Sequence, residues 1–363
     1  MPNKTKFYYV SEIQGKGLGC VAITEIKKGT LILRESAGFH HFGDSYEYID
    51  KAYLDGLFQG YLTMSNEEKE KYLSLANCFS DPMTPSTSSA GKMEDVVKYL
   101  KDGHINLGSE EAQLVFQIYH TNCFHNGIFL EMSRFNHSCT SNAEYLWNED
   151  TETRDVRAIR KIKKGGEITI NYNIVDAEER GMTRDERRAY LKEIYHFHCN
   201  CIGCDLSEDE LKIQNEKCGE YRKIVSHMKE QDRVNELIVM RTSDTSSEVD
   251  DLKALYKLAK ELKIVRHRII LRDIAEEGFD AACQGYLTMI EILKSANSTV
   301  HKEKRDNFWQ NLTCFANAGY DISKVVNGPE HSDTLDWQKM KQDPIAFFNT
   351  GNFICWQTWG GWN

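Results

Sequence analysis

The segment SRFNHSCTSN, residues 133–142, gathers polar and thiol side chains directly before an apolar, strand-like stretch. Asn136 and His137 carry groups that can hydrogen-bond an amino-acid-like or adenine-like ligand. Alternatively, the same segment could be an ordinary structural loop that turns around a buried cysteine, Cys139. The segment alone supports both interpretations, and the choice depends on the motifs that surround it.

Two further segments, later in the chain, contain side chains that could take part in catalysis or metal binding. In GGEITINY (165–172) a turn leads into a strand that ends on Tyr172, whose hydroxyl could orient a reacting group. In YHFHCNCIGC (195–204) three cysteines fall within six residues, which in a reducing setting indicates a metal site. Zinc prefers four tetrahedral ligands, so one ligand must come from elsewhere. The candidates are His196, His198, Cys218 and the more distant Cys139.

A glycine-rich turn, GKGLG (15–19), lies near the start of the chain. Glycines let backbone amides approach a ligand closely, but such a turn also suits an ordinary hairpin. The spacing is not G-x-G-x-x-G opening a helix, so no dinucleotide site follows. The apolar stretches CVAIT (20–24) and TLILRE (30–35), separated by a turn, predict two strands of a hairpin.

Composition limits the class of protein. The chain has 363 residues, of which 40% are hydrophobic, and this suits a folded protein of about two domains. A net charge of −10 disfavours direct nucleic-acid binding and suits a basic partner. No apolar run approaches the length of a membrane span. Eleven cysteines without a secretion signal indicate a reducing compartment, so we expect the cytoplasm, the nucleus or both.

Taken in order, these motifs resemble those of the SET-domain protein lysine methyltransferases. The matching set is the glycine turn, N-x-F (Asn122, Phe124), N-H-S-C, G-E-x-x-x-x-Y and the terminal C-x-C-x-x-C. The sub-pattern resembles the SET and MYND group and fungal SET proteins like it. Residues 36–110 contain a single cysteine, Cys78, so no MYND zinc module is expected. Ser141 stands where the family usually has proline, and we expect only a small effect.

The resemblance implies an α+β SET fold, a knot-like assembly of small β-sheets. It places the segment near 133–139 beside the strand that ends at Tyr172. We expect residues 1–40 and 120–176 to form the SET domain. The expected additions are a helical insertion at 41–119 with a mobile loop at 80–92, a linker helix and post-SET zinc segment at 177–206, and a mainly helical C-terminal region at 207–363.

The resemblance also implies a site. Tyr172 would be the catalytic tyrosine, assisted by Tyr195. Cys139 would complete a structural zinc site of four cysteines with Cys199, Cys201 and Cys204, leaving no open position for a catalytic water. The residues expected around the methyl donor S-adenosylmethionine are Gln14, Gly15, Lys16, Gly17, Asn136, His137, Tyr172, Tyr195 and Phe197.

The implied activity is methyl transfer from S-adenosylmethionine to the ε-amine of lysine in a protein substrate. That substrate would carry a basic segment, in a histone tail or in a non-histone protein. The alternative is a SET-fold protein with weak or no activity that acts as an interaction module. A zinc-dependent hydrolase is a third interpretation, but it needs an open metal position. The sequence indicates neither the oligomeric state nor the number of methyl groups added.

Overall fold

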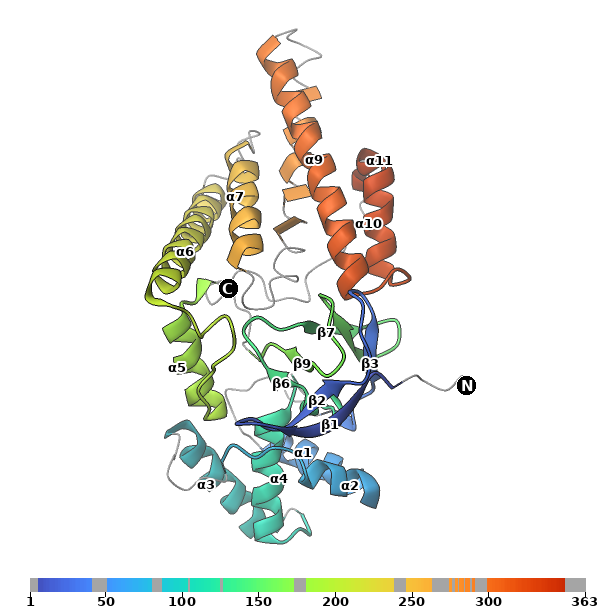
Figure 1. The fold of residues 1–363 in the computed structure, drawn as a ribbon, viewed down its shortest axis with the longest axis vertical. Helices are drawn as coiled ribbons and strands as arrows, with labels where there is room; N and C mark the ends of the chain where they lie inside the picture. The colour runs from blue at the N-terminus through green and yellow to red at the C-terminus, as the bar shows by residue number, and fades with distance from the viewer. Residues whose placement is uncertain are drawn as a thin grey trace.

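The computed structural model describes residues 6–40, 51–79, 87–103, 105–124, 127–172, 181–237, 246–262 and 299–349, with short helical pieces between 274 and 290. Small β-sheets lie in the middle of the molecule, between two groups of helices (Figure 1). One helical group comes from the insertion and the other from the C-terminal region. This arrangement confirms the predicted α+β class.

The central sheet has four strands in the order β1-β2-β9-β6. β1 (Tyr8–Ile13) and β2 (Gly17–Ala22) form an antiparallel hairpin around the glycine turn. β2 also pairs antiparallel with β9 (Glu167–Ile170), so Cys20 lies opposite Ile168. The sheet therefore joins the beginning of the chain to a strand that follows much later.

β6 (Asn136–His137) completes this sheet and runs parallel to β9. Asn136 lies opposite Thr169, and His137 lies opposite Ile170. The predicted threading of the 133–139 segment beside the strand that leads to Tyr172 is thus observed.

The expected hairpin between residues 20–24 and 30–35 is wrong. β3 (Leu31–Glu35) pairs with β8 (Thr153–Ala158), and β8 pairs with β7 (Ala143–Asn148), in a separate sheet. The intervening turn forms a bridge between Ile26 and Ile162, which carries the chain from one sheet to the other. A short pair, β4 (Phe39–His40) with β5 (Gly127–Ile128), leads towards the insertion.

The insertion contains the helices α1 (Lys51–Thr63), α2 (Asn66–Leu73), α3 (Thr87–Lys101) and α4 (Ser109–Asn122). Their apolar faces share one core, which is rich in aromatic side chains. α3 begins at Thr87, inside the predicted loop at 80–92, and its residues Val96 and Tyr99 are buried in that core. The rest of the predicted loop, 80–86, lies outside the described residues.

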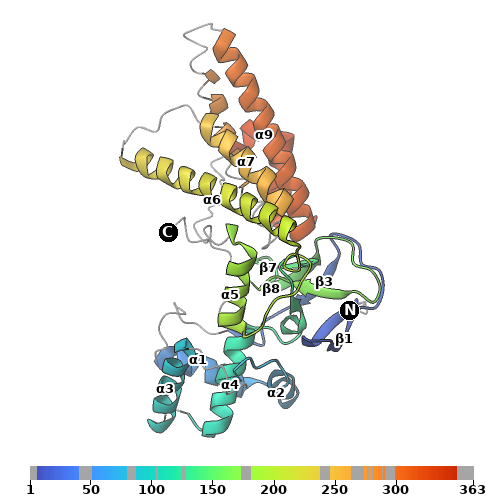
Figure 2. The same ribbon diagram turned by 60° about the vertical axis from the view of Figure 1, so that its left-hand side comes forward.

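α5 (Arg184–Tyr195) leads directly into the cysteine segment and lies beside the sheets (Figure 2). Thr183 and Glu186 form a capping box that begins the helix. His196 ends it with a left-handed backbone (φ 56°), which turns the chain sharply. Within the 177–206 segment the helix is therefore α5, and residues 177–180 lie outside the described residues.

The C-terminal region is helical as far as the structure describes it. Its longer helices are α6 (Glu208–Leu237), α7 (Ser246–Leu262), α9 (Thr299–Val326), α10 (Ser332–Gln342) and α11 (Pro344–Asn349). α9 contacts the β7–β8 sheet, where Leu146 and Ile159 join the helical core. No helix among the described residues is sufficiently long and apolar to span a bilayer. The domain boundaries themselves stay a prediction.

Gly319 and Trp337 provide a test of packing in this region. The Trp337 ring is fully buried and lies against Gly319, so that a Cβ added at Gly319 would collide with it. We expect Gly319→Ala to lower the free energy of unfolding by about 1–3 kcal/mol in a denaturant titration.

Gly219→Ala is the matched control, because this glycine lies in α6 with open space around its Cβ position. We expect that change to stabilise the helix by roughly 0.5–1 kcal/mol. Equal effects of the two substitutions would contradict the packing of α9 against α10.

Candidate functional site

The candidate site forms where β6 lies beside the end of β9. β9 ends at Ile170, so Tyr172 lies two residues beyond the strand and not at its last position. The Tyr172 backbone N–H donates to His137 Nδ1 at 3.0 Å, and the Tyr172 hydroxyl donates to the Phe135 carbonyl oxygen at 2.7 Å. Both ends of Tyr172 are therefore held by the 135–137 segment.

His137 is hydrogen-bonded through both ring nitrogens. Nδ1 accepts the Tyr172 N–H, so the proton of the neutral ring resides on Nε2, which lies 3.3 Å from Cys139 Sγ. Burial lowers the pKa of His137 to about 3, so the ring is neutral at pH 7. The imidazole thus faces Tyr172 and Cys139.

Aromatic rings surround this point. The distances between ring centroids are 5.1 Å for Tyr172 and Tyr195, 6.4 Å for Tyr195 and Phe197, and 5.8 Å for Phe197 and His137. The left-handed backbone of His196 allows Tyr195 and Phe197 to turn towards the same centre. Three segments that are separate in sequence therefore build one apolar, aromatic wall.

Both tyrosines are neutral phenols. Burial raises the pKa of Tyr172 and the pKa of Tyr195 above the usual value for a phenol. Neither hydroxyl can act as a base near neutral pH, so their chemical role is limited to hydrogen bonding and packing.

Four cysteines form a compact cluster next to this wall. The Sγ atoms of Cys139, Cys199, Cys201 and Cys204 all lie within 4.8 Å of one another. Cys139 Sγ is 3.9 Å from Cys199 Sγ and 3.5 Å from Cys204 Sγ. Tetrahedral zinc with Zn–S bonds of about 2.3 Å separates sulfurs by about 3.8 Å, so the cluster fits that ion.

The cluster also decides between the candidate fourth ligands. Cys139 is a member, whereas His196, His198 and Cys218 lie outside the group. The Cys218 thiol instead donates to the Met182 carbonyl oxygen at 3.5 Å. Four sulfur ligands would close the coordination, so the geometry favours a structural ion and opposes a metal-dependent hydrolase.

The glycine turn approaches the same site from β1 and β2. Lys16 Nζ pairs with Glu167 Oε2 at 2.6 Å, and Asn136 Nδ2 donates to Glu167 Oε1 at 3.0 Å. Gly19 lies beneath this group, and a Cβ there would collide with Asn136 Nδ2. The structure thus brings Lys16 and Asn136 together. Gln14 is exposed in the turn, and no recorded contact among the described residues joins it to them.

Sequence reasoning missed two polar residues here, Glu167 and Asn142. Glu167 lies inside the GGEITINY motif, in which only Tyr172 was predicted to be a site residue. Asn142 donates from Nδ2 to the Glu167 carbonyl oxygen and accepts at Oδ1 from Thr169 N–H, so its amide continues the sheet. Asn142 ends the quoted 133–142 segment, but the sequence did not indicate that its side-chain amide would bond to a strand.

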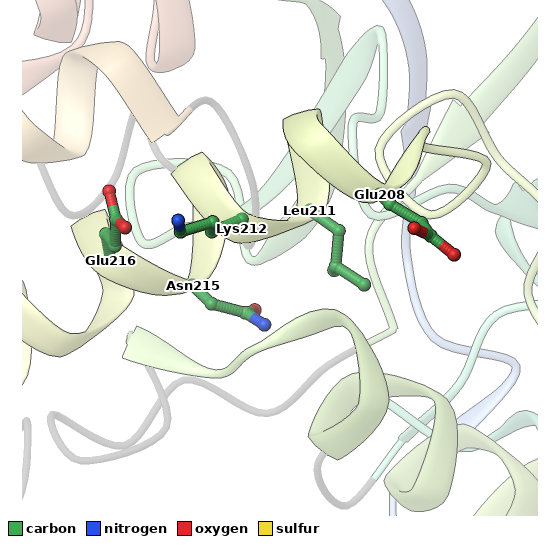
Figure 3. A pocket seen from close by; sticks show the side chains of 5 residues that line it. All are labelled: Glu208, Leu211, Lys212, Asn215 and Glu216. Atoms are coloured by element: carbon green, nitrogen blue, oxygen red, sulfur yellow. The ribbon is translucent and has the colours of Figure 1, made fainter.

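A surface pocket lies along the first turns of α6, and all of its lining side chains come from that helix (Figure 3). These residues are Glu208, Leu211, Lys212, Asn215 and Glu216. The pocket contains none of the predicted site residues.

The fold and the geometry agree with a comparison to protein families. Residues 17–173 match the family model described as the SET domain, so this part of the chain is a SET domain. The match includes the glycine turn from Gly17, the N-H-S-C motif and Tyr172. The predicted resemblance and the SET fold are thereby confirmed.

The chain is also similar to several named lysine methyltransferases. Histone-lysine N-methyltransferase set5 of Schizosaccharomyces pombe is 28% identical over 212 residues, covering 58% of this chain and 54% of the relative. Protein-lysine N-trimethyltransferase SMYD5 of Mus musculus is 36% identical over 96 residues, 26% of this chain and 23% of its own. Histone-lysine N-methyltransferase SMYD3 of Mus musculus is 27% identical over 228 residues, 57% of this chain and 50% of its own. The chain therefore spans about half or less of each relative.

The cysteine cluster generates a prediction about metal content. We expect about one tightly held zinc ion per chain by elemental analysis, because all four sulfurs are already grouped as a closed site. Removing the ion with a strong chelator should lower the midpoint of thermal unfolding.

Cys201→Ser should abolish tight zinc binding, since it removes one of the four sulfur ligands. Cys314→Ser is the control, because this exposed cysteine lies far along the chain in α9. Well-folded protein without zinc, or equal zinc content in both variants, would contradict the site.

Proposed function

We propose that this chain transfers a methyl group from S-adenosylmethionine to the ε-amine of a lysine in a protein substrate. The observation that supports the proposal is the β6–β9 pairing within a SET domain, in which His137 accepts a hydrogen bond from Tyr172 and Asn136 donates one to Glu167. The names of the relatives support the same reaction, on histones for two of them and on protein lysine for the third. Both kinds of substrate are therefore retained for this chain.

The donor would bind where the glycine turn meets β6. When bound, S-adenosylmethionine supplies an electrophilic methyl group on a sulfonium. The Lys16 ammonium is 40% exposed and is the cation suited to the donor's carboxylate. Glu167 orients this ammonium together with the Asn136 amide. Gly15 and Gly17 adopt positive φ (74° and 70°), which shapes the turn, and Gly19 leaves room for Asn136.

The aromatic wall would prepare the lysine. A free lysine has a pKa of about 10.4, so a neutral amine must be favoured by the site. Rings of Tyr172, Tyr195 and Phe197 remove water from the ammonium, and this lowers the pKa of the substrate amine. Alignment of the amine with the methyl group then supplies much of the rate.

Tyr172 would orient the amine rather than deprotonate it. Its hydroxyl proton is donated to the Phe135 carbonyl oxygen, which leaves the phenol oxygen free to accept from the amine. Because burial raises the pKa of Tyr172, the hydroxyl keeps its proton throughout. The four cysteines would hold a structural zinc ion that fixes the Tyr195–Phe197 segment beside it.

The charge of the chain supports a basic substrate segment. The net charge is −10 in the sequence, and a lysine-rich peptide would be attracted by it. The same charge opposes direct contact with nucleic acid.

The decisive experiment compares Tyr172→Phe with the unchanged protein. We expect methyl transfer from labelled donor to a lysine-containing peptide array to fall by about 100-fold or more, because the acceptor oxygen is lost. Donor affinity measured by calorimetry should change by less than about threefold.

Tyr9→Phe is the matched control, because it removes the same hydroxyl group from an exposed tyrosine on β1, away from the site. It should keep full activity. Donor binding without any turnover by the unchanged protein, on every basic peptide, would instead identify an interaction module. Equal turnover by both variants would refute the role of Tyr172.

Gly19→Ala tests the donor site from the other side. The added Cβ would displace Asn136 and push against Ile13 Cγ1, which lies 2.8 Å from the Cβ position. We expect the donor Kd to rise by about tenfold or more, equivalent to about 1.4 kcal/mol. Gly219→Ala in α6 should leave the Kd unchanged, and an unaltered Kd in Gly19→Ala would contradict the placement of the donor.

A further inference from the structure

Arg187 is a fully buried arginine that the proposed methyl transfer does not use. It lies in the first turns of α5 with 0% of the residue exposed. A guanidinium is always charged at physiological pH, and a charge without water must be compensated by a partner. The contacts of the guanidinium identify that partner.

The oxygen partners of Arg187 are all uncharged. Nη1 donates to the Met182 carbonyl oxygen at 2.8 Å. Nη2 donates to the Gly203 carbonyl oxygen at 2.9 Å and to Gln214 Oε1 at 3.2 Å. The remaining contact of Nη2 is with Cys204 Sγ at 3.7 Å, so among the described residues this cation contacts a cluster sulfur and no carboxylate.

The cysteine cluster has the charge that would compensate Arg187. A zinc ion held by four thiolates carries a net charge of −2. Cys139, Cys199 and Cys204 are each at most 3% exposed and Cys201 is half-buried, so water offsets only part of that charge. His137 also approaches the cluster through Nε2, but its ring is neutral, because Nδ1 accepts a hydrogen bond. Of His137 and Arg187, only Arg187 carries a positive charge.

We propose that Arg187 is an outer-sphere residue of the cysteine cluster, whose guanidinium offsets the negative charge of the metal tetrathiolate and thereby raises its affinity for zinc. N–H donors that reach ligand atoms typically tune a metal site in this way. The inference rests on the cluster holding a metal and not on methyl transfer. A failure of one proposal therefore leaves the other standing.

The neighbouring Arg188 provides a matched comparison. It hydrogen-bonds the same segment through the carbonyl oxygens of Cys199 and Cys204, at 3.0 and 3.1 Å, and through Asn200 Oδ1 at 3.4 Å. It has no recorded contact with a sulfur among the described residues. Removal of Arg188 thus costs hydrogen bonds to the loop and removes a cation that contacts carbonyl oxygens instead of a sulfur.

The experiment measures zinc affinity of the full chain by competition with a chromogenic chelator. We expect Arg187→Met to weaken zinc binding by about 10- to 100-fold. Arg187→Lys keeps the charge, so its zinc affinity should fall clearly less than that of Arg187→Met. The zinc affinity of Arg188→Met should fall by less than about threefold. Zinc release driven by iodoacetamide should also be faster in Arg187→Met, because the thiolates lose a compensating cation.

Circular dichroism of the zinc-saturated variants checks that the fold is kept. If Arg187→Met does not fold, Arg187→Gln replaces it in the same comparison. Zinc affinity of the uncharged variant equal to that of the unchanged protein would overturn the proposal. Equal losses in Arg187→Lys and the uncharged variant would also overturn it, because charge would then not be the cause. An equal loss in Arg188→Met would overturn it as well, because the contact of Arg187 with a cluster sulfur would then have no effect of its own.

Discussion

The parallel pairing of β6 with β9 is the contact on which the site depends. It consists of two residue pairs, Asn136 with Thr169 and His137 with Ile170. From it follow the hydrogen bonds of Tyr172 and the position of Asn136 beside Glu167. So short a strand is stable only because other groups reinforce it, among them the Asn142 amide, which bonds to β9. The site is thus built by tertiary structure rather than by any single element.

His137 connects this pairing to the cysteine cluster. One ring nitrogen bonds the backbone of Tyr172, and the other faces Cys139. A displacement of the cluster therefore reaches Tyr172 through a single side chain. The aromatic wall adds a second connection, because Tyr195 and Phe197 precede the cysteines by only a few residues. The cysteine cluster and the candidate catalytic residue Tyr172 are therefore connected through His137 and through the Tyr195–Phe197 segment.

Much of the site followed from motifs, but several features depend on distant contacts. The resemblance named Cys139 as the fourth ligand, whereas spacing alone left four candidates open. The partner of β2 was predicted incorrectly, because local alternation of apolar residues does not reveal which distant strand pairs with it. Arg187 went unnoticed since charged residues on a polar helix normally face solvent. Its spacing of four residues from the buried Leu191 was the one available signal for a buried face.

The pairing of β2 with β9 has a consequence for biosynthesis. The N-terminal hairpin leaves the ribosome long before Ile168, so one edge of the nascent sheet has no partner while the whole insertion is translated. Contacts between segments so far apart in the chain form slowly, because a long loop must close first. The last cysteine of the cluster, Cys204, emerges later still. Newly made chains of this protein therefore pass through a stage in which an open strand edge is exposed to aggregation and ungrouped thiols are exposed to oxidation.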